Sequence, residues 1–282
     1  MEKKKQKTIK KSITSDGIGL HTGKSIKVNF KSAPCNSGII FKRIDLPKSP
    51  MIKAEYKNVV NSKREVTLKI DSIEIHTIEH LLATLSAMGI NNLLVEMDGP
   101  ELPIGDGSSH HFCEILKEAG TCEQEEVQDV LICKEPIFIN DGEKYLIALP
   151  SNKEEFKISF TADFDHPIGT QFASYLINEE TFLNEICKAR TFGFLHEVKE
   201  LWANNLAQGG NLNNAVVIGK NNILNGELRY DNELVRHKIL DLMGDLYLAG
   251  KPIIADIIAI KSGHCINIKL VEKLLQNLMT NS

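Results

Sequence analysis

One segment in the last quarter of the chain places polar side chains at helical spacing. It contains His237, Asp241 and Asp245, each four residues from the next. On a helix this spacing brings the three side chains to one side. Imidazole and carboxylate at positions i and i+4 can bind one metal ion, and these ligand types suit zinc. The segment therefore predicts part of a metal site.

The same segment carries apolar residues at helical spacing. The apolar residues form the opposite stripe and are Val235, Ile239, Leu242, Met243 and Leu246. A helix with such a stripe packs it against a core. The polar side is therefore available to meet another part of the protein.

A third metal ligand is expected upstream, because a catalytic zinc usually has three protein ligands and one open position. The candidate is His80, which lies off the apolar stripe of a second predicted helix. The stripe consists of Ile78, Leu81, Leu82, Leu85 and Met88. Residue types alone favour a structural histidine at position 80 over a ligand. Glu79, beside His80, could serve as a general base for a water molecule that the metal activates.

The composition limits the classes of protein to which the chain can belong. Its 282 residues, 42% of them hydrophobic, suffice for one large domain or two small ones. The net charge of −4 gives no overall basic excess, which argues against nucleic-acid binding. Six lysines fall within residues 1–11, where we expect a solvated tail.

The chain shows no targeting or membrane pattern. The basic start is not followed by the apolar stretch of a signal peptide, and no run of about 18 apolar residues occurs. The six cysteines form no CxxC pair. We therefore expect reduced thiols in a cytoplasmic protein and no cysteine-based metal site.

Hydrophobic periodicity and turn residues divide the chain into elements. Expected strands lie within 8–30, 39–41, 65–70, 92–97, 130–140, 144–149, 155–163, 213–218 and 253–261. Expected helices span 77–88, 108–118, 179–187, 232–249 and 267–278. The polar, acidic stretch 121–129 is the expected boundary between domains 1–127 and 128–282.

The order of elements is similar in the two halves, although their residues do not repeat. Each metal-bearing helix would cover a sheet with its apolar stripe and turn its other side towards the opposite half. This predicts an α+β fold of two similar domains, layered sheet–helices–helices–sheet, with the metal site at the domain junction.

Several motifs, in order, resemble those of the UDP-3-O-acyl-N-acetylglucosamine deacetylases, the zinc amidases of lipid A synthesis. The matching segments are 17–23 (GIGLHTG), 77–80 (TIEH), 101–108 (ELPIGDGS), 163–167 (DFDHP), 189–194 (ARTFGF), 235–238 (VRHK) through Gly244-Asp245, and 262–264 (SGH). Together they cover nearly the whole chain. The departures are the lysine-rich start and conservative changes such as Ile78.

The resemblance implies a small insert in each domain, near residues 38–62 and 193–222. The second insert would wall an apolar passage for the acyl chain of the substrate. Phe192, Phe194, Ala215 and Val217 are the candidates for contacts along this passage. Ordinary core packing is the alternative for each of them.

The resemblance also implies roles for the polar residues. His80, His237 and Asp241 would bind Zn²⁺, although the same ligands accept Fe²⁺. Glu79 would be the general base.

Two further groups would handle the charge and the protons of the reaction. His264, held charged by Asp245, would stabilise the oxyanion or protonate the leaving amine. Which of His264 and Glu79 gives this proton stays open. Thr191 would donate its hydroxyl to the oxyanion.

Other residues are expected to bind the substrate. Lys238 could reach the sugar or the diphosphate, and a solvated lysine is the alternative. Phe160, Asp163 and Lys261 are candidates for the nucleotide end. His21 lies in a matching motif but receives no role.

The function implied by the resemblance is removal of acetate from UDP-3-O-(3-hydroxyacyl)-N-acetylglucosamine. The enzyme would be a cytoplasmic monomer with at most peripheral membrane contact. Two alternatives stay open: a nucleotide-sugar-binding protein with a structural metal, and a zinc hydrolase or lyase for another substrate. Three visible ligands favour an open catalytic site over a closed structural one.

Overall fold

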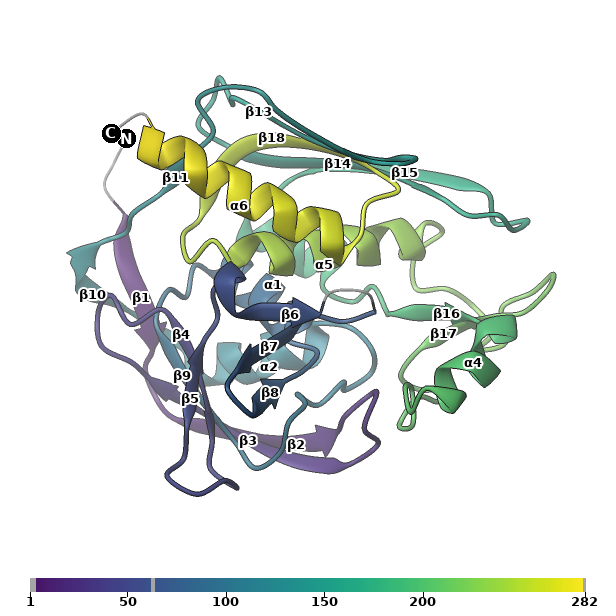
Figure 1. The fold of residues 1–282 in the computed structure, drawn as a ribbon, viewed down its shortest axis with the longest axis horizontal. Coiled ribbons are helices and arrows are strands. Elements are labelled where there is room, and N and C mark those ends of the chain that lie inside the picture. Colours follow the sequence, from purple (N-terminus) through teal and green to yellow (C-terminus); the bar gives the residue numbers. More distant parts are fainter. Residues whose placement is uncertain (1–3, 62–63, 281–282) are drawn as a thin grey trace.

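The computed structural model describes residues 4–61 and 64–280 and arranges them in layers (Figure 1). One outer layer is a sheet of β2 (Ile13–Ile18), β3 (Ser25–Ser32), β9 (Leu93–Met97), β4 (Ile39–Arg43) and β5 (Met51–Lys53), in that order. The other is a sheet of β12 (Ile137–Asp141), β13 (Lys144–Leu149), β18 (Ile253–Ile260), β14 (Phe156–Asp163) and β15 (Thr170–Leu176), with the short β11 (Leu131–Ile132) beside β18.

Helices fill the space between the two sheets (Figure 1). They are α1 (Glu79–Met88), α2 (His110–Ala119), α5 (Glu233–Tyr247) and α6 (His264–Thr280). The predicted α+β layering, sheet–helices–helices–sheet, is confirmed.

Alternation along the strands explains how each sheet faces the helices. In β3, Ile26, Val28 and Phe30 are at most 4% exposed while their neighbours face outwards. The stripe of α1 joins these residues in one hydrophobic core, and the stripe of α5 joins β14 and β18 in a second core. Each half of the chain therefore buries its own apolar face, as the periodicity predicts.

The two central helices approach each other closely at Gly244 of α5. A Cβ atom at this position would overlap the carbonyl oxygen of Glu79, the first residue of α1. Only a residue without a side chain lets the two backbones come this near. The close approach brings the polar side of α5 to the start of α1.

Two smaller sheets flank this framework. One contains β6 (Val59–Asn61), β7 (Thr67–Ile70) and β8 (Ile73–Ile75). The other pairs β16 (Phe192–Phe194) with β17 (Val216–Ile218) and lies near α4 (Val198–Ala203) (Figure 1).

The first small sheet corrects one expectation. An insert was expected near residues 38–62, but β4 and β5 in that range belong to the outer sheet, and the separate sheet follows them. The second small sheet falls within or beside the range expected for the second insert.

The lysine-rich start contains a paired strand, so the expectation of a solvated tail is wrong for residues 5–9. Strand β1 (Lys5–Ile9) pairs with β10 (Thr121–Val127), and Gln6, Thr8 and Ile9 point inwards. Residues 1–3 lie outside the described part. Strand β10 also occupies the polar stretch expected at the domain boundary, and the division at 127 and 128 stays a prediction.

Helix α6 begins at His264, three residues before the expected start. Among the described residues, no helix is both long and apolar enough to cross a membrane.

Gly244→Ala should lower the free energy of unfolding by about 1–3 kcal/mol, because the added methyl group must push α5 away from α1. Thermal or urea unfolding measures this change. Gly193→Ala is the control, because a Cβ atom at Gly193 has no heavy atom within 4 Å. Equal stability of the two variants would contradict the close packing at Gly244.

Candidate active site

Three buried side chains from α1 and α5 converge at the helix contact. His237 Nε2 lies 3.3 Å from Asp241 Oδ1, and His80 Nε2 lies 3.9 Å from the same oxygen. The imidazole rings of His80 and His237 meet edge to face, with 5.0 Å between their centroids. One ligand atom from each residue lies within 4.8 Å of the others, which is close enough to hold one ion.

The protonation states of the two histidines suit metal binding. Burial and the neighbouring His237 lower the pKa of His80 to about 3, and burial lowers the pKa of His237. His237 donates its Nδ1–H to the carbonyl oxygen of Ala189 at 3.0 Å, so the lone pair of Nε2 faces the other ligands. Two neutral imidazoles and a carboxylate are a donor set that fits zinc.

Asp241 stays ionised although it is buried. Burial acts to raise its pKa, but Lys238, His237 and His264 act more strongly together and hold the pKa well below its usual range. Lys238 donates to Asp241 Oδ2 at 2.8 Å. The ammonium group that was expected to reach the substrate thus supports a candidate metal ligand in this structure.

Glu79 begins α1 and lies beside the three candidate ligands. Burial, assisted by the charges of Asp241 and Asp245, raises its pKa to about 8 despite the opposing charge of His264. The backbone N–H of Val66 donates to Glu79 Oε2 at 3.2 Å. A carboxyl group that gains and loses a proton near neutral pH is suited to general acid–base catalysis.

The buried carboxylate of Asp245 holds His264 through a hydrogen bond. Its Nδ1–H donates to Asp245 Oδ2 at 2.8 Å, and Asn267 donates to the same oxygen at 2.7 Å. Burial acts to lower the pKa of His264, but Asp245 outweighs it and raises the pKa to about 9. The imidazole is therefore cationic at neutral pH and is suited to stabilise developing negative charge.

A buried ion pair positions Thr191 and Ala189. Between them, Arg190 places Nε 2.7 Å from Glu233 Oε1, and Glu233 is fully buried at the start of α5. The backbone N–H of Arg190 also donates to Glu233. This pair fixes the 189–191 segment against the helix that carries His237. Thr191 lines the same small cavity as Glu79 and His264.

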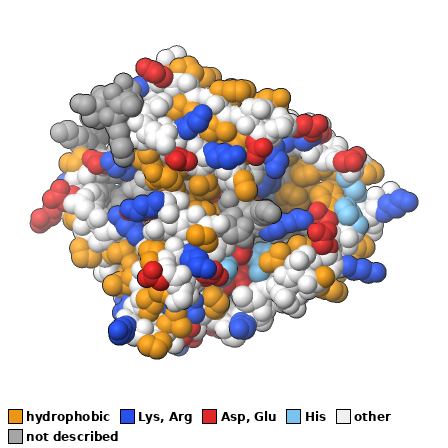
Figure 2. Space-filling view, in the orientation of Figure 1, with side chains coloured by type: hydrophobic (Ala, Val, Ile, Leu, Met, Phe, Trp, Pro, Cys, Tyr) orange, Lys and Arg blue, Asp and Glu red, His pale blue; other side chains and the backbone are white. Residues whose placement is uncertain are grey.

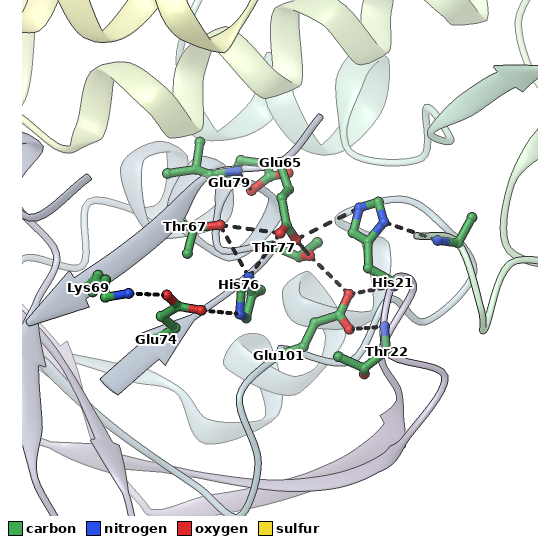
Figure 3. A network of polar contacts seen from close by, with 12 residues as sticks. His21, Thr22, Glu65, Thr67, Lys69, Glu74, His76, Thr77, Glu79 and Glu101 are labelled. Carbon is green, nitrogen blue, oxygen red and sulfur yellow. Dashed lines mark hydrogen bonds and ion pairs between the residues drawn. The ribbon is translucent and has the colours of Figure 1, made fainter. Parts of the chain in front are cut away.

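The turn before Glu79 has an uncommon backbone conformation. Thr77 has a φ of 56°, in the left-handed region that β-branched residues rarely adopt. Such a conformation costs about 1–3 kcal/mol and persists only where the surroundings enforce it. The Thr77 hydroxyl meets the carboxylates of Glu65 at 2.8 Å and Glu101 at 3.0 Å (Figure 3). These contacts hold the backbone before α1 in the position at which Glu79 and His80 line the cavity.

The residues expected along the passage lie together near the site. Phe192 places its ring 6.1 Å from that of His237 and 5.5 Å from that of Phe164. Phe194 also contacts Phe164, and these half-buried rings pack with β17 in a small apolar cluster. Ala215 and Val217 are half-buried beside or in β17. Figure 2 shows apolar side chains gathered in a hollow near β16, bordered by charged and histidine side chains.

The three candidates for the nucleotide end lie elsewhere. Phe160 is 1% exposed within the second hydrophobic core. Lys261 and Asp163 form a surface ion pair at 3.2 Å, and Lys261 also meets Glu143 at 2.8 Å. None of the three lines the cavity that contains the candidate ligands.

Sequence reasoning missed several residues that the structure brings to the site. His21 and Arg64 line the cavity, and Arg64 is ion-paired with Glu197 at 3.2 Å. The position of His21 in a matching motif could have identified it. Arg64 and Glu65 carried no local signal, because their proximity to α1 arises from packing of the first small sheet.

The chain is similar to known proteins over nearly its whole length. A family model described as UDP-3-O-acyl N-acetylglycosamine deacetylase matches residues 6–276. A UDP-3-O-acyl-N-acetylglucosamine deacetylase from Syntrophotalea carbinolica is 46% identical over 274 residues, 96% of this chain and 88% of that protein. Proteins of the same name from Geobacter sp. and Saccharophagus degradans are 44% and 41% identical, over 96% of this chain and 89% and 90% of theirs.

His237→Ala should abolish stoichiometric binding of a divalent metal, because only two of the three converging ligands remain. Metal content of the purified, folded variant measures this loss. His196→Ala, which removes an exposed histidine, should keep the metal. Full metal content in the His237 variant would show that the ion binds elsewhere.

Proposed function

The chain belongs to the UDP-3-O-acyl N-acetylglycosamine deacetylase family, and from this premise we propose its reaction and the roles of its residues. The proposed reaction is hydrolysis of the N-acetyl group of UDP-3-O-(3-hydroxyacyl)-N-acetylglucosamine. The products are acetate and the free 2-amine, and the reaction is the committed step of lipid A biosynthesis. The convergence of His80, His237 and Asp241 beside Glu79 is the observation that carries the proposal.

Members of the family are metalloenzymes, and we propose Zn²⁺ as the metal of this chain, with Fe²⁺ as the alternative. The metal would be held by His80, His237 and Asp241. When bound, zinc supplies a Lewis acid that polarises the acetamide carbonyl and lowers the pKa of a water molecule.

Glu79 is the general base of the proposed mechanism. Its carboxylate takes the proton of the attacking water, and burial has already raised its affinity for protons. A metal cation at the three ligands would favour the ionised form of Glu79 before attack.

The negative charge that develops on the carbonyl oxygen requires a hydrogen-bond donor or a cation to stabilise it. The Thr191 hydroxyl is proposed to donate to this oxygen, and the His264 imidazolium to stabilise it. Asp245 keeps the imidazole oriented and charged through the 2.8 Å hydrogen bond. Either His264 or Glu79 then gives a proton to the leaving amine.

The remaining roles concern the rest of the substrate. The cluster with Phe192, Phe194, Ala215 and Val217 is proposed to bind the acyl chain, supported by its apolar character and its contact with His237. Lys238 is proposed to exchange part of its contact with Asp241 for the sugar or the diphosphate.

Fewer observations support the proposed contacts with the nucleotide end of the substrate. Asp163 and Lys261 stay candidates through surface charge alone, and Phe160 could contribute only by packing beneath them.

We further propose that the enzyme is a cytoplasmic monomer that acts on a small-molecule substrate. Cys35, Cys113, Cys122, Cys133 and Cys187 are free thiols, which suits a reducing compartment. Peripheral contact with a membrane surface would follow from the lipid character of the substrate and from the basic residues near β1.

Glu79→Gln should keep the bound metal and lower kcat by about 10²–10⁴-fold, because the amide cannot accept the proton of the attacking water. Acetate release from the acylated UDP-sugar measures this loss. Glu118→Gln, a surface change 69% exposed at its side chain, should keep wild-type turnover. Near-normal turnover in the Glu79 variant would exclude this residue as the base.

Asp245→Asn should move the alkaline limb of the pH–rate profile to lower pH. Asp245 raises the pKa of His264 to about 9, so wild-type activity that needs the imidazolium falls as pH rises through that pKa. Without the carboxylate the imidazole loses its proton at lower pH. The profile of kcat/KM between pH 6 and 10 measures the shift. If the alkaline limb did not move, deprotonation of His264 would not be the cause of the fall in activity.

A further inference from the structure

A connected set of polar side chains lies beneath the start of α1 and is not used by the proposed mechanism (Figure 3). Its centre is Glu65, which is 4% exposed. Glu65 Oε1 accepts hydrogen bonds from His76 Nδ1 at 2.9 Å and Thr67 Oγ1 at 3.2 Å, and Oε2 accepts from Thr77 Oγ1 at 2.8 Å. We call Glu65 and these three donors the Glu65 network.

A neighbouring group of His21, Glu65 and Glu101 has the spacing of a metal site, but its hydrogen bonds indicate otherwise. His21 Nδ1 accepts the backbone N–H of Ala207 at 3.3 Å, so Nε2, which faces Glu65, carries the proton and has no lone pair for a metal. Glu101 accepts the backbone N–H groups of His21 and Thr22 at 2.8 and 2.7 Å. The group is therefore a hydrogen-bonded support.

The Glu65 network is connected to Glu79 by two short routes. Val66, the residue after Glu65, is fully buried, and its backbone N–H donates to Glu79 Oε2 at 3.2 Å. Thr77, which Glu65 holds through its hydroxyl, precedes Glu79 by two residues and has the strained left-handed backbone. Displacement of the Glu65 side chain would thus move both the Val66 N–H group that donates to Glu79 and the turn at Thr77 that precedes Glu79.

Charge keeps the network in place. Burial acts to raise the pKa of Glu65, but the hydrogen bonds from His76 and Thr77 and the electrostatic attraction of the neighbouring His21 and His76 outweigh it and lower the pKa. Burial acts to lower the pKa of His76, and Glu65 and then Glu74 outweigh it and raise the pKa. A buried, ionised carboxylate that accepts three hydrogen bonds is held in one position, because bonds to a charged acceptor are strong.

We propose that Glu65 is a positioning residue for the general base: by fixing Val66 and Thr77 it orients the carboxylate of Glu79 in the cavity. This inference rests on the proposed role of Glu79. It assigns to the small sheet of β6, β7 and β8 a part in the reaction, although no residue of the network reacts.

The test compares kcat and KM for acetate release by metal-loaded variants. Glu65→Gln should lower kcat at least ten-fold and keep KM within two-fold. Glutamine has one acceptor oxygen in place of two, so its NH₂ group would face either His76 or Thr77, from which it cannot accept a hydrogen bond. Thr77→Val keeps the β-branched shape, removes the hydroxyl and should act in the same direction. Glu74→Gln is the matched control: Glu74 is the other carboxylate facing His76, but it is 40% exposed and does not approach Glu79. It should keep wild-type values.

The decisive comparison repeats Glu65→Gln in the Glu79→Gln background. If Glu65 acts through Glu79, it should change the residual rate by less than two-fold once the carboxylate at position 79 is absent. A loss that multiplies with the loss from Glu79→Gln would overturn the proposal, because Glu65 would then act independently. Wild-type kcat in folded Glu65→Gln would overturn it as well.

A measurement without turnover keeps the proposal testable if Glu65→Gln folds poorly. Amide hydrogen exchange at Val66 should be faster in Thr77→Val than in wild type and unchanged in Glu74→Gln. An unchanged rate of amide exchange at Val66 in Thr77→Val would contradict the proposed connection between the Glu65 network and Glu79. If wild type releases acetate and Glu79→Gln does too, the role of Glu79 fails and this inference fails with it; if only the Glu65 result is negative, the proposed function stands.

Discussion

The close approach of α1 and α5 at Gly244 is the contact on which the site depends. Two of the candidate ligands, His237 and Asp241, lie on α5, and the third, His80, is the second residue of α1. The two helices must therefore nearly touch for one ion to reach all three. A side chain at position 244 would separate them. The two sheets outside the helices hold this contact from both sides, because each helix buries its apolar stripe in a different core.

Bringing the helices together also buries charge, and the structure balances it locally. Asp241 is paired with Lys238, Asp245 with His264, and Glu233 with Arg190. An unpaired charge at any of these places would be costly in a medium of low polarity. The same pairings set the chemistry, since they keep Asp241 ionised and His264 cationic while burial leaves Glu79 able to take up a proton.

Both small sheets act on the site from its edges. β16 continues from the segment that Arg190 anchors, and places Phe192 against His237. The strands β6, β7 and β8 bring Glu65 beneath Thr77, where the carboxylate helps to enforce an unfavourable backbone conformation. The outer layers thus provide the rigid frame, and the inserted sheets adjust individual side chains.

Features that depend on neighbours along the chain could be predicted from the residues alone. The apolar stripes of α1 and α5, the four-residue spacing of His237, Asp241 and Asp245, and the α+β layering all follow from periodicity. The proposed ligand role of His80 rests on its place off the stripe together with the family motifs, because residue type alone favours a structural histidine.

Contacts between residues far apart in the chain could not be predicted in the same way. The start of the chain looked like a solvated tail, yet it pairs with a strand more than 110 residues away. Phe160 suited a binding surface by type but lies in the core, whereas Glu65 and Arg64 carried no signal and lie beside the catalytic candidates. The physical reason is that periodicity reports which face of an element is buried, while contacts between elements depend on how their surfaces pack, and that information is spread over the whole chain.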